Sequence, residues 1–115
     1  MVIYEVSLAI DTDVYPQFQS WLKKHVAEML EFPGFTLASI LKPENEELSD
    51  QEKLIVHYHI ENREALDHYF SEFAPKMRGE GIALFNDKFS AVRKIYEVQE
   101  NISKNYTRNM YILLM

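Results

Sequence analysis

The chain has 115 residues, 47% of them hydrophobic and 13% aromatic, with 12 basic and 18 acidic side chains and no cysteine. This length fits a single domain, and the apolar fraction excludes a disordered chain. A sequence without cysteine has no disulfide, zinc–thiolate site or thiol nucleophile. The formal net charge of −6 argues against a general nucleic-acid binder, which needs a basic surface.

The beginning of the chain carries no targeting pattern. It lacks a basic segment followed by a long apolar stretch, so it does not read as a secretory signal. No apolar run approaches the roughly 18–20 residues that a membrane-spanning helix needs. We therefore expect a cytoplasmic protein that binds neither membranes nor nucleic acids.

The first two elements are distinguished by their hydrophobic period. Residues 2–10 alternate, which is typical of a strand. From Val14 the apolar spacing becomes helical, and Pro33-Gly34 is expected to end the helix. The helical stripe consists of Val14, Phe18, Trp21, Leu22, Val26 and Met29.

Two strands are predicted in the middle of the chain. Residues 35–42 form the first, residues 43–51 are a polar connection, and residues 52–60 form the second. One face of the second strand is apolar and consists of Leu54, Val56, Tyr58 and Ile60.

A second helix and a fourth strand complete the pattern. Asn62 is placed to cap the helix. Pro75 is expected to kink or end it, because proline removes an amide donor, and the glycines of residues 79–81 support that break. After a short apolar turn over 82–85, residues 88–98 predict the last strand. The stripe of this helix consists of Leu66, Tyr69, Phe70, Phe73 and Met77.

The order strand, helix, strand, strand, helix, strand is typical of an α+β, ferredoxin-like βαββαβ fold. That fold is a four-stranded antiparallel sheet with two helices on one face. The opposite face of this sheet mixes apolar residues such as Ile3 and Ile55 with Glu5, His57 and His59. It is too apolar to face water, and a second copy of the same sheet is its simplest cover. The sequence therefore predicts a homodimer.

Short motifs along the chain resemble a bacterial family known only as a domain of unknown function. That family is similar to the dimeric α/β-barrel proteins, in which two ferredoxin-like sheets face each other. The motifs are Ile3-Tyr4-Glu5-Val6, Trp21 with His25, Gly34-Phe35, Tyr69, Ala74-Pro75-Lys76-Met77-Arg78 and Phe89-Ser90-Ala91-Val92-Arg93.

The resemblance covers roughly residues 1–99 and implies a ferredoxin-like α/β-barrel domain over residues 1–100. Residues 101–115 are then a C-terminal extension, for which packing on the partner subunit and disorder both stay open. Proteins of this architecture include cofactor-free quinone-forming monooxygenases, haem-degrading enzymes and isomerases. Their pockets lie between the helices and the sheet, and the fold alone does not choose among these functions.

His25 is the best candidate for chemistry. It lies within the apolar stripe of the first helix, where it would point into the gap between helix and sheet. Imidazole titrates near neutral pH, so it could act there as an acid, a base or a haem ligand. The commoner alternative is a buried histidine whose nitrogens are satisfied by a tyrosine hydroxyl or a backbone carbonyl.

Aromatic and basic side chains are expected around this histidine. Tyr4, Tyr58 and Tyr69 fall on the inward faces of their elements, and buried tyrosines need hydrogen-bond partners. Together with Trp21 they predict a pocket for a small-molecule ligand, although for each tyrosine a core role is commoner than a catalytic one. Arg78 and Arg93 belong to the motifs of the resemblance and could hold a carboxylate or phenolate, although a structural salt bridge is the commoner role.

No metal or cofactor site is predicted. His57 and His59 project from one side of a strand and could bind a metal with Glu5, but no further histidine or cysteine supports such a site. The segment Gly79-Glu80-Gly81 lacks the third glycine and the preceding strand of a dinucleotide loop.

Two hypotheses about function stay open. The first is a binding or structural module without catalytic activity. The second is a cofactor-independent enzyme of monooxygenase or isomerase type. In that enzyme His25 would be the base on an acidic phenol or enol, and Tyr4 or Tyr58 would hold the oxygen.

Overall fold

The structure is a computed structural model that describes residues 1–44 and 49–104. Its sheet has four strands in the order β2-β3-β1-β4, and every neighbouring pair is antiparallel. The elements are β1 (Val2–Asp11), the 3₁₀ turn η1 (Thr12–Val14), α1 (Tyr15–Met29), β2 (Phe35–Leu41), β3 (Gln51–Ile60), α2 (Arg63–Glu72), α3 (Ala74–Phe85) and β4 (Phe89–Glu97).

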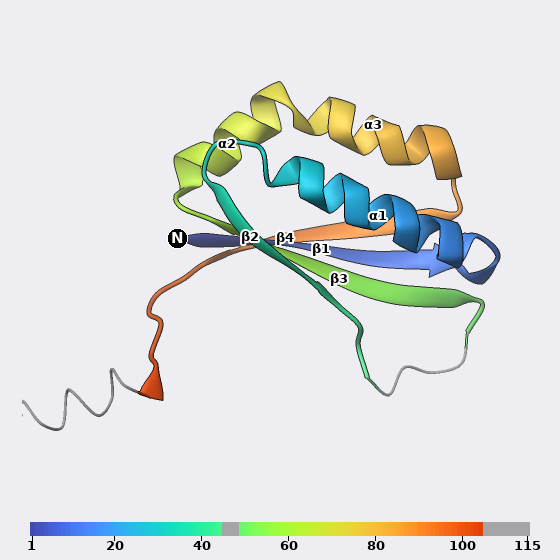
Figure 1. Ribbon diagram of the computed structural model, residues 1–115, viewed down its shortest axis with the longest axis horizontal. Coiled ribbons are helices and arrows are strands. Elements are labelled where there is room, and N and C mark those ends of the chain that lie inside the picture. Colours follow the sequence, from blue (N-terminus) through green and yellow to red (C-terminus); the bar gives the residue numbers. More distant parts are fainter. Residues whose placement is uncertain (45–48, 105–115) are drawn as a thin grey trace, which may run out of the picture.

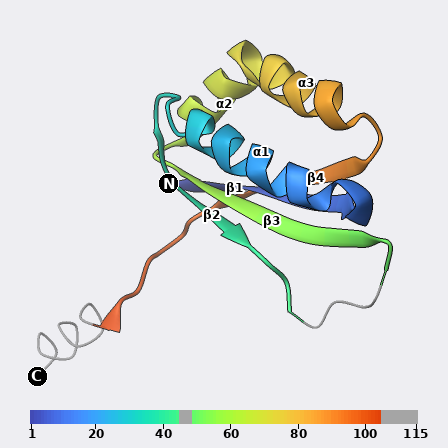
Figure 2. The ribbon, with the colours of Figure 1, turned by 45° about the vertical axis from the view of Figure 1, so that its right-hand side comes forward.

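The helices all lie on one face of the sheet, as both ribbon views show (Figure 1, Figure 2). The core between them is apolar, and its largest fully buried side chains include Tyr4, Phe18 and Leu66. The predicted ferredoxin-like α+β fold is therefore confirmed. Among the described residues, no helix combines the length and the apolar character needed to cross a membrane.

The second helical region has the break that was expected near Pro75, but a further helix follows that break. The region is divided into α2 and α3 at Phe73, whose backbone angles leave the helical region at φ −126° and ψ −26°. Pro75 lies in the first turn of α3, where a missing amide donor breaks no hydrogen bond. The glycines of residues 79–81 do not break the helix, and the predicted turn over 82–85 is its last turn.

Burial explains why α3 continues through its glycines. A glycine inside a helix costs roughly 0.5–1 kcal/mol relative to alanine. Against that cost, α3 buries Ala74, Met77 and Phe85 on the sheet, and each large apolar side chain that becomes fully buried contributes roughly 1.5–3 kcal/mol. Within residues 1–44 and 49–104 the fold therefore has three α-helices rather than the two that were predicted.

The strand register determines which side chains meet beneath the helices. In the central strand β1, Tyr4 is paired with Tyr58 of β3 and with Ile95 of β4. Val6, two residues further along the same face, is paired with Arg93 of β4. Because side chains alternate between the faces of a strand, these residues all point toward the helices.

The other face of the sheet has no cover from the described chain (Figure 1). At its centre Glu5 accepts hydrogen bonds from His57 at 2.8 Å and from the Tyr96 hydroxyl at 3.2 Å. The bond from His57 is the largest influence on the Glu5 carboxyl and lowers its pKa, although burial acts in the opposite direction. Around this cluster Leu37 and Val92 are 54% and 61% exposed.

The turn between α1 and β2 depends on Gly34. Its φ of +85° lies in the region that L side chains avoid, and its carbonyl accepts the amide hydrogen of Glu61 at 2.9 Å. An added Cβ would lie 2.5 Å from the Cβ of Ala65.

Most of the predicted C-terminal extension, residues 105–115, lies outside the described residues.

We predict that Gly34→Ala destabilises the fold by at least about 1–2 kcal/mol, the usual cost of a left-handed backbone for an L residue. The contact with Ala65 adds to that cost, so thermal unfolding should shift down by several degrees. The matched control is Gly79→Ala, because a Cβ at that position of α3 meets nothing within 4 Å. Equal melting temperatures for the two variants would contradict this account of the turn.

Candidate functional site

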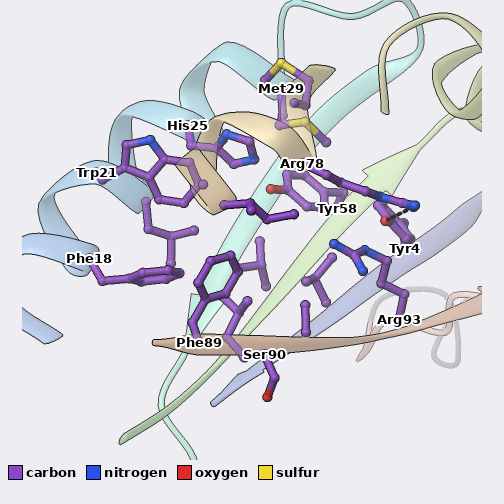
Figure 3. A pocket seen from close by; sticks show the side chains of 18 of the residues that line it. Tyr4, Phe18, Trp21, His25, Met29, Tyr58, Arg78, Phe89, Ser90 and Arg93 are labelled. Carbon is purple, nitrogen blue, oxygen red and sulfur yellow. Dashed lines mark hydrogen bonds between the residues drawn. The ribbon is translucent and has the colours of Figure 1, made fainter. Parts of the chain in front are cut away.

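A pocket of about 240 Å³ opens between the helices and the sheet. Figure 3 shows its walls: Phe18, Trp21 and His25 come from α1, and Phe89 comes from β4. The structure brings all the predicted site residues to this pocket, and they are Tyr4, Trp21, His25, Tyr58, Tyr69, Arg78 and Arg93.

His25 lies against Trp21, with ring centroids 4.5 Å apart and an angle of 25° between the planes. Its Nδ1 atom is buried and has no hydrogen-bond partner among the described residues. The alternative of a histidine with both nitrogens satisfied therefore does not hold in the described part of the chain. An unpaired polar atom at this depth is costly, and ligand sites are one of the few settings that explain it.

The protonation state of His25 follows from its surroundings. Burial lowers the pKa of the imidazole below its ordinary value, and the nearby carboxylates of Glu80 and Glu28 only partly oppose this. A lowered pKa favours the neutral ring at physiological pH. The side chain can therefore accept a proton from a ligand, as a general base must.

Three tyrosines form an aromatic cluster in the same pocket, in which Tyr4 stacks on Tyr58 and is tilted against Tyr69. The Tyr4 ring lies 5.9 Å from that of Tyr58 and 6.3 Å from that of Tyr69. Burial raises the pKa of Tyr58 far above its ordinary value and that of Tyr69 to about 12. Tyr58 and Tyr69 are therefore neutral hydroxyls that can donate a hydrogen bond to an oxygen anion.

Arg78 and Arg93 enter the pocket from different elements, α3 and β4. Arg78 Nη2 donates to the Tyr4 hydroxyl at 3.4 Å, and its guanidinium lies 5.8 Å from the Phe70 ring centroid. Neither arginine forms an ion pair with a carboxylate in the part of the chain that the structure describes. The structural salt bridge expected for these arginines is therefore not found there.

Gly81 determines how closely Trp21 approaches α3. A Cβ at Gly81 would lie 2.9 Å from Cη2 of Trp21 and 3.3 Å from Cζ of Phe89. The bare helix surface thus lets these aromatic rings form the wall of the pocket. Sequence reasoning missed Gly81 and Ile82 as pocket residues because it ended the helix before them. The signal was present, since Met77, Gly81 and Phe85 continue one helical face.

The histidine pair of β3 does not belong to this site. His57 binds Glu5 on the opposite face of the sheet. Within residues 1–44 and 49–104, no group of three or more histidine, aspartate or glutamate side chains could hold a metal ion.

The fold and the position of this pocket define a ferredoxin-like protein with a pocket between its helices and its sheet. More narrowly, the chain belongs to the family described as Domain of unknown function (DUF4286), whose model matches residues 1–99. No curated protein matches the chain.

Several solved structures share the fold at low sequence identity. A candidate antibiotic biosynthesis monooxygenase from Deinococcus radiodurans superposes with a TM-score of 0.71 at 14% identity, over 90% of this chain and 97% of that one. SnoaB, a cofactor-independent oxygenase from Streptomyces nogalater, gives a TM-score of 0.66 at 13% identity, over 90% and 98%.

A third structure carries a ligand. MhuD from Mycobacterium tuberculosis, a haem degrader with two haems bound in its active site, gives a TM-score of 0.66 at 18% identity, over 90% of this chain and 100% of that one. At these identities the likeness establishes the fold and not the activity.

We predict that His25 makes the fold less stable in mild acid. Below pH 6.5 the unfolded chain protonates this histidine, whereas the folded state resists because its pKa is lowered. Stability should therefore fall between pH 7 and pH 5, and His25→Leu should remove that part of the loss. Urea unfolding at several pH values measures the difference.

The control for this experiment is His68→Leu, which changes an exposed histidine of α2. The acid loss caused by protonating Glu5 lies below its ordinary pKa of 4.5 and is common to all variants. Parallel stability curves for the wild type and His25→Leu would contradict the lowered pKa.

Proposed function

We propose that the pocket binds a compact aromatic phenol or enol and that His25 removes the proton of its acidic hydroxyl. The observation that carries this proposal is the buried, unpartnered Nδ1 of His25 within an aromatic pocket. A planar aromatic body fits walls made of Phe18, Trp21 and Phe89, because aromatic rings stack favourably on one another.

The reaction that fits this arrangement is a cofactor-independent oxidation by dioxygen. His25 takes the phenolic proton, and Tyr58 donates a hydrogen bond to the resulting oxygen anion. The electron-rich phenolate then reacts with dioxygen at a ring carbon that bears hydrogen. For a naphthol the balance is naphthol plus dioxygen to naphthoquinone plus water, so dioxygen is both the oxidant and the source of the new oxygen atoms.

The fold likeness to SnoaB and to the candidate monooxygenase supports this reaction class. Haem is the other ligand that a fold neighbour suggests. The pocket measures about 240 Å³, below the roughly 300–1,000 Å³ typical of sites for drug-sized ligands. A porphyrin therefore fits this pocket less well than a compound of one or two rings.

We further propose that the protein is a homodimer joined through the uncovered face of the sheet. That face carries exposed Val92, Leu37 and Tyr96 around the half-buried Glu5 and His57 pair. An apolar surface with its polar centre already hydrogen-bonded matches an interface core. A two-fold arrangement would place the same face of a second copy on it.

A cytoplasmic location stays a prediction from the sequence.

The catalytic proposal predicts that His25→Gln lowers oxygen uptake with a naphthol by about 10²–10⁴-fold, the usual contribution of a general base. Binding should survive, because glutamine keeps the volume and polarity of the site. An oxygen electrode measures the rate. Binding is followed by the fluorescence of Trp21, which is the single tryptophan of the chain and lines the pocket.

The matched control is His68→Gln, which changes an exposed histidine outside the pocket. A naphthol that quenches Trp21 without any oxygen uptake would contradict the oxidation and favour a binding module. If haem binds, as seen from a shift of its absorption band, and naphthols do not, the proposed ligand class is overturned.

The homodimer proposal predicts a dimer mass for the wild type at micromolar concentration, measured by light scattering. Val92→Glu should convert it to a monomer, because a charge would be buried at the interface without a partner. Leu84→Glu is the matched control, since Leu84 is also 61% exposed but lies on α3. A monomeric wild type, or an equal effect of both variants, would contradict the interface.

A further inference from the structure

We infer that Arg78 and Arg93 form an anion-binding end of the pocket and that the ligand carries a carboxylate as well as an acidic hydroxyl. This inference rests on the proposed function, because it concerns the same pocket. It adds the charge of the ligand, which the fold and the position of His25 leave open.

Neither Arg78 nor Arg93 has a carboxylate partner within the described residues. The chain has 18 acidic side chains for 12 basic ones, so an arginine without an ion pair is notable. The ion pairs within the described residues are Lys42–Glu52, His57–Glu5, Arg63–Asp67 and Lys88–Asp13. None of these carboxylates lines the pocket. The guanidinium groups of Arg78 and Arg93 thus bring positive charge to a site with no aspartate or glutamate among its described lining residues.

The two arginines lie at the same end of the pocket. Arg78 from α3 and Arg93 from β4 both lie on the Tyr4 side of the pocket, whereas His25 and Trp21 lie on the other side (Figure 3). Both positive charges act on the Tyr69 hydroxyl and hold its pKa lower than burial alone would. One end of the pocket therefore carries the positive charges of Arg78 and Arg93. The other end carries His25, which is uncharged and can accept a proton.

A carboxylate is the kind of anion that fits these arginines. A guanidinium presents its donors as a planar fork, which matches the two oxygens of a carboxylate. The Arg78 contact to Tyr4 is long, at 3.4 Å, and uses only one nitrogen. Its remaining donors are available to a ligand in the described structure. An aromatic ring between the two ends would place a carboxylate at the arginines and a hydroxyl near His25.

The test compares two probes that differ only by a carboxylate, 6-hydroxy-2-naphthoate and 2-naphthol, because the hydroxyl and the carboxylate of the first lie at opposite ends of the ring system. Calorimetry measures their affinities, and quenching of Trp21 locates binding in the pocket. We expect the wild type to bind the acid at least about tenfold more tightly, since hydrogen bonds to charged groups are the stronger ones. Arg93→Met and Arg78→Met should each reduce that preference severalfold, and the double variant should abolish it.

The matched control is Lys94→Met, which removes a positive charge one residue away on the opposite face of β4. It should keep the preference for the acid. Arg78 and Arg93 are exposed, so their variants should fold, and circular dichroism verifies this. Arg93→Lys should keep part of the preference, because lysine supplies charge without the fork.

The outcomes separate the two proposals. Equal affinity of the wild type for both probes would overturn the anion-binding end and leave the proposed function intact. A preference that persists in the double variant would overturn it as well. No binding of either probe would overturn the proposed function, and the anion-binding end with it.

Discussion

The pairing of β1 with both of its neighbours is the constraint on which the rest of the molecule depends. Because β1 lies between β3 and β4, each of its residues from Val2 to Ile10 has a partner on both strands. Adjacent residues of the strand then serve opposite surfaces: Tyr4 lies in the pocket and Glu5 in the uncovered face. A shift of the register by one residue would exchange these surfaces and remove both the pocket and the proposed interface.

The pocket next to β1 is lined by polar side chains that leave some of their hydrogen-bonding atoms without partners. Trp21 stacks on His25 without hydrogen-bonding to it, and Arg78 reaches Tyr4 only at 3.4 Å. A protein core is normally close-packed and pairs its buried polar atoms. The departures from both rules coincide at one place, which is where a ligand would supply the missing contacts.

Much of the architecture could be predicted from the sequence, because period-two and helical patterns report which side of each element is buried. The pocket residues His25, Tyr58 and Arg93 followed from the same faces and from the motifs around them. The course of α3 could not be predicted from local signals. The break near Pro75 was anticipated, since α2 ends at Glu72, but a proline also suits the first turn of a new helix. Burial by tertiary packing then outweighed the low helix propensity of the glycines.

The most direct test of the central claim is an NMR pH titration of the imidazole signals, of which the chain has 4. The account predicts that the His25 signal titrates below 6.5, the ordinary value for histidine. It also predicts that this signal moves when 6-hydroxy-2-naphthoate is added, whereas those of His57, His59 and His68 do not. A His25 that titrates at or above 6.5, or that ignores the ligand, would contradict a neutral base in a ligand-binding pocket.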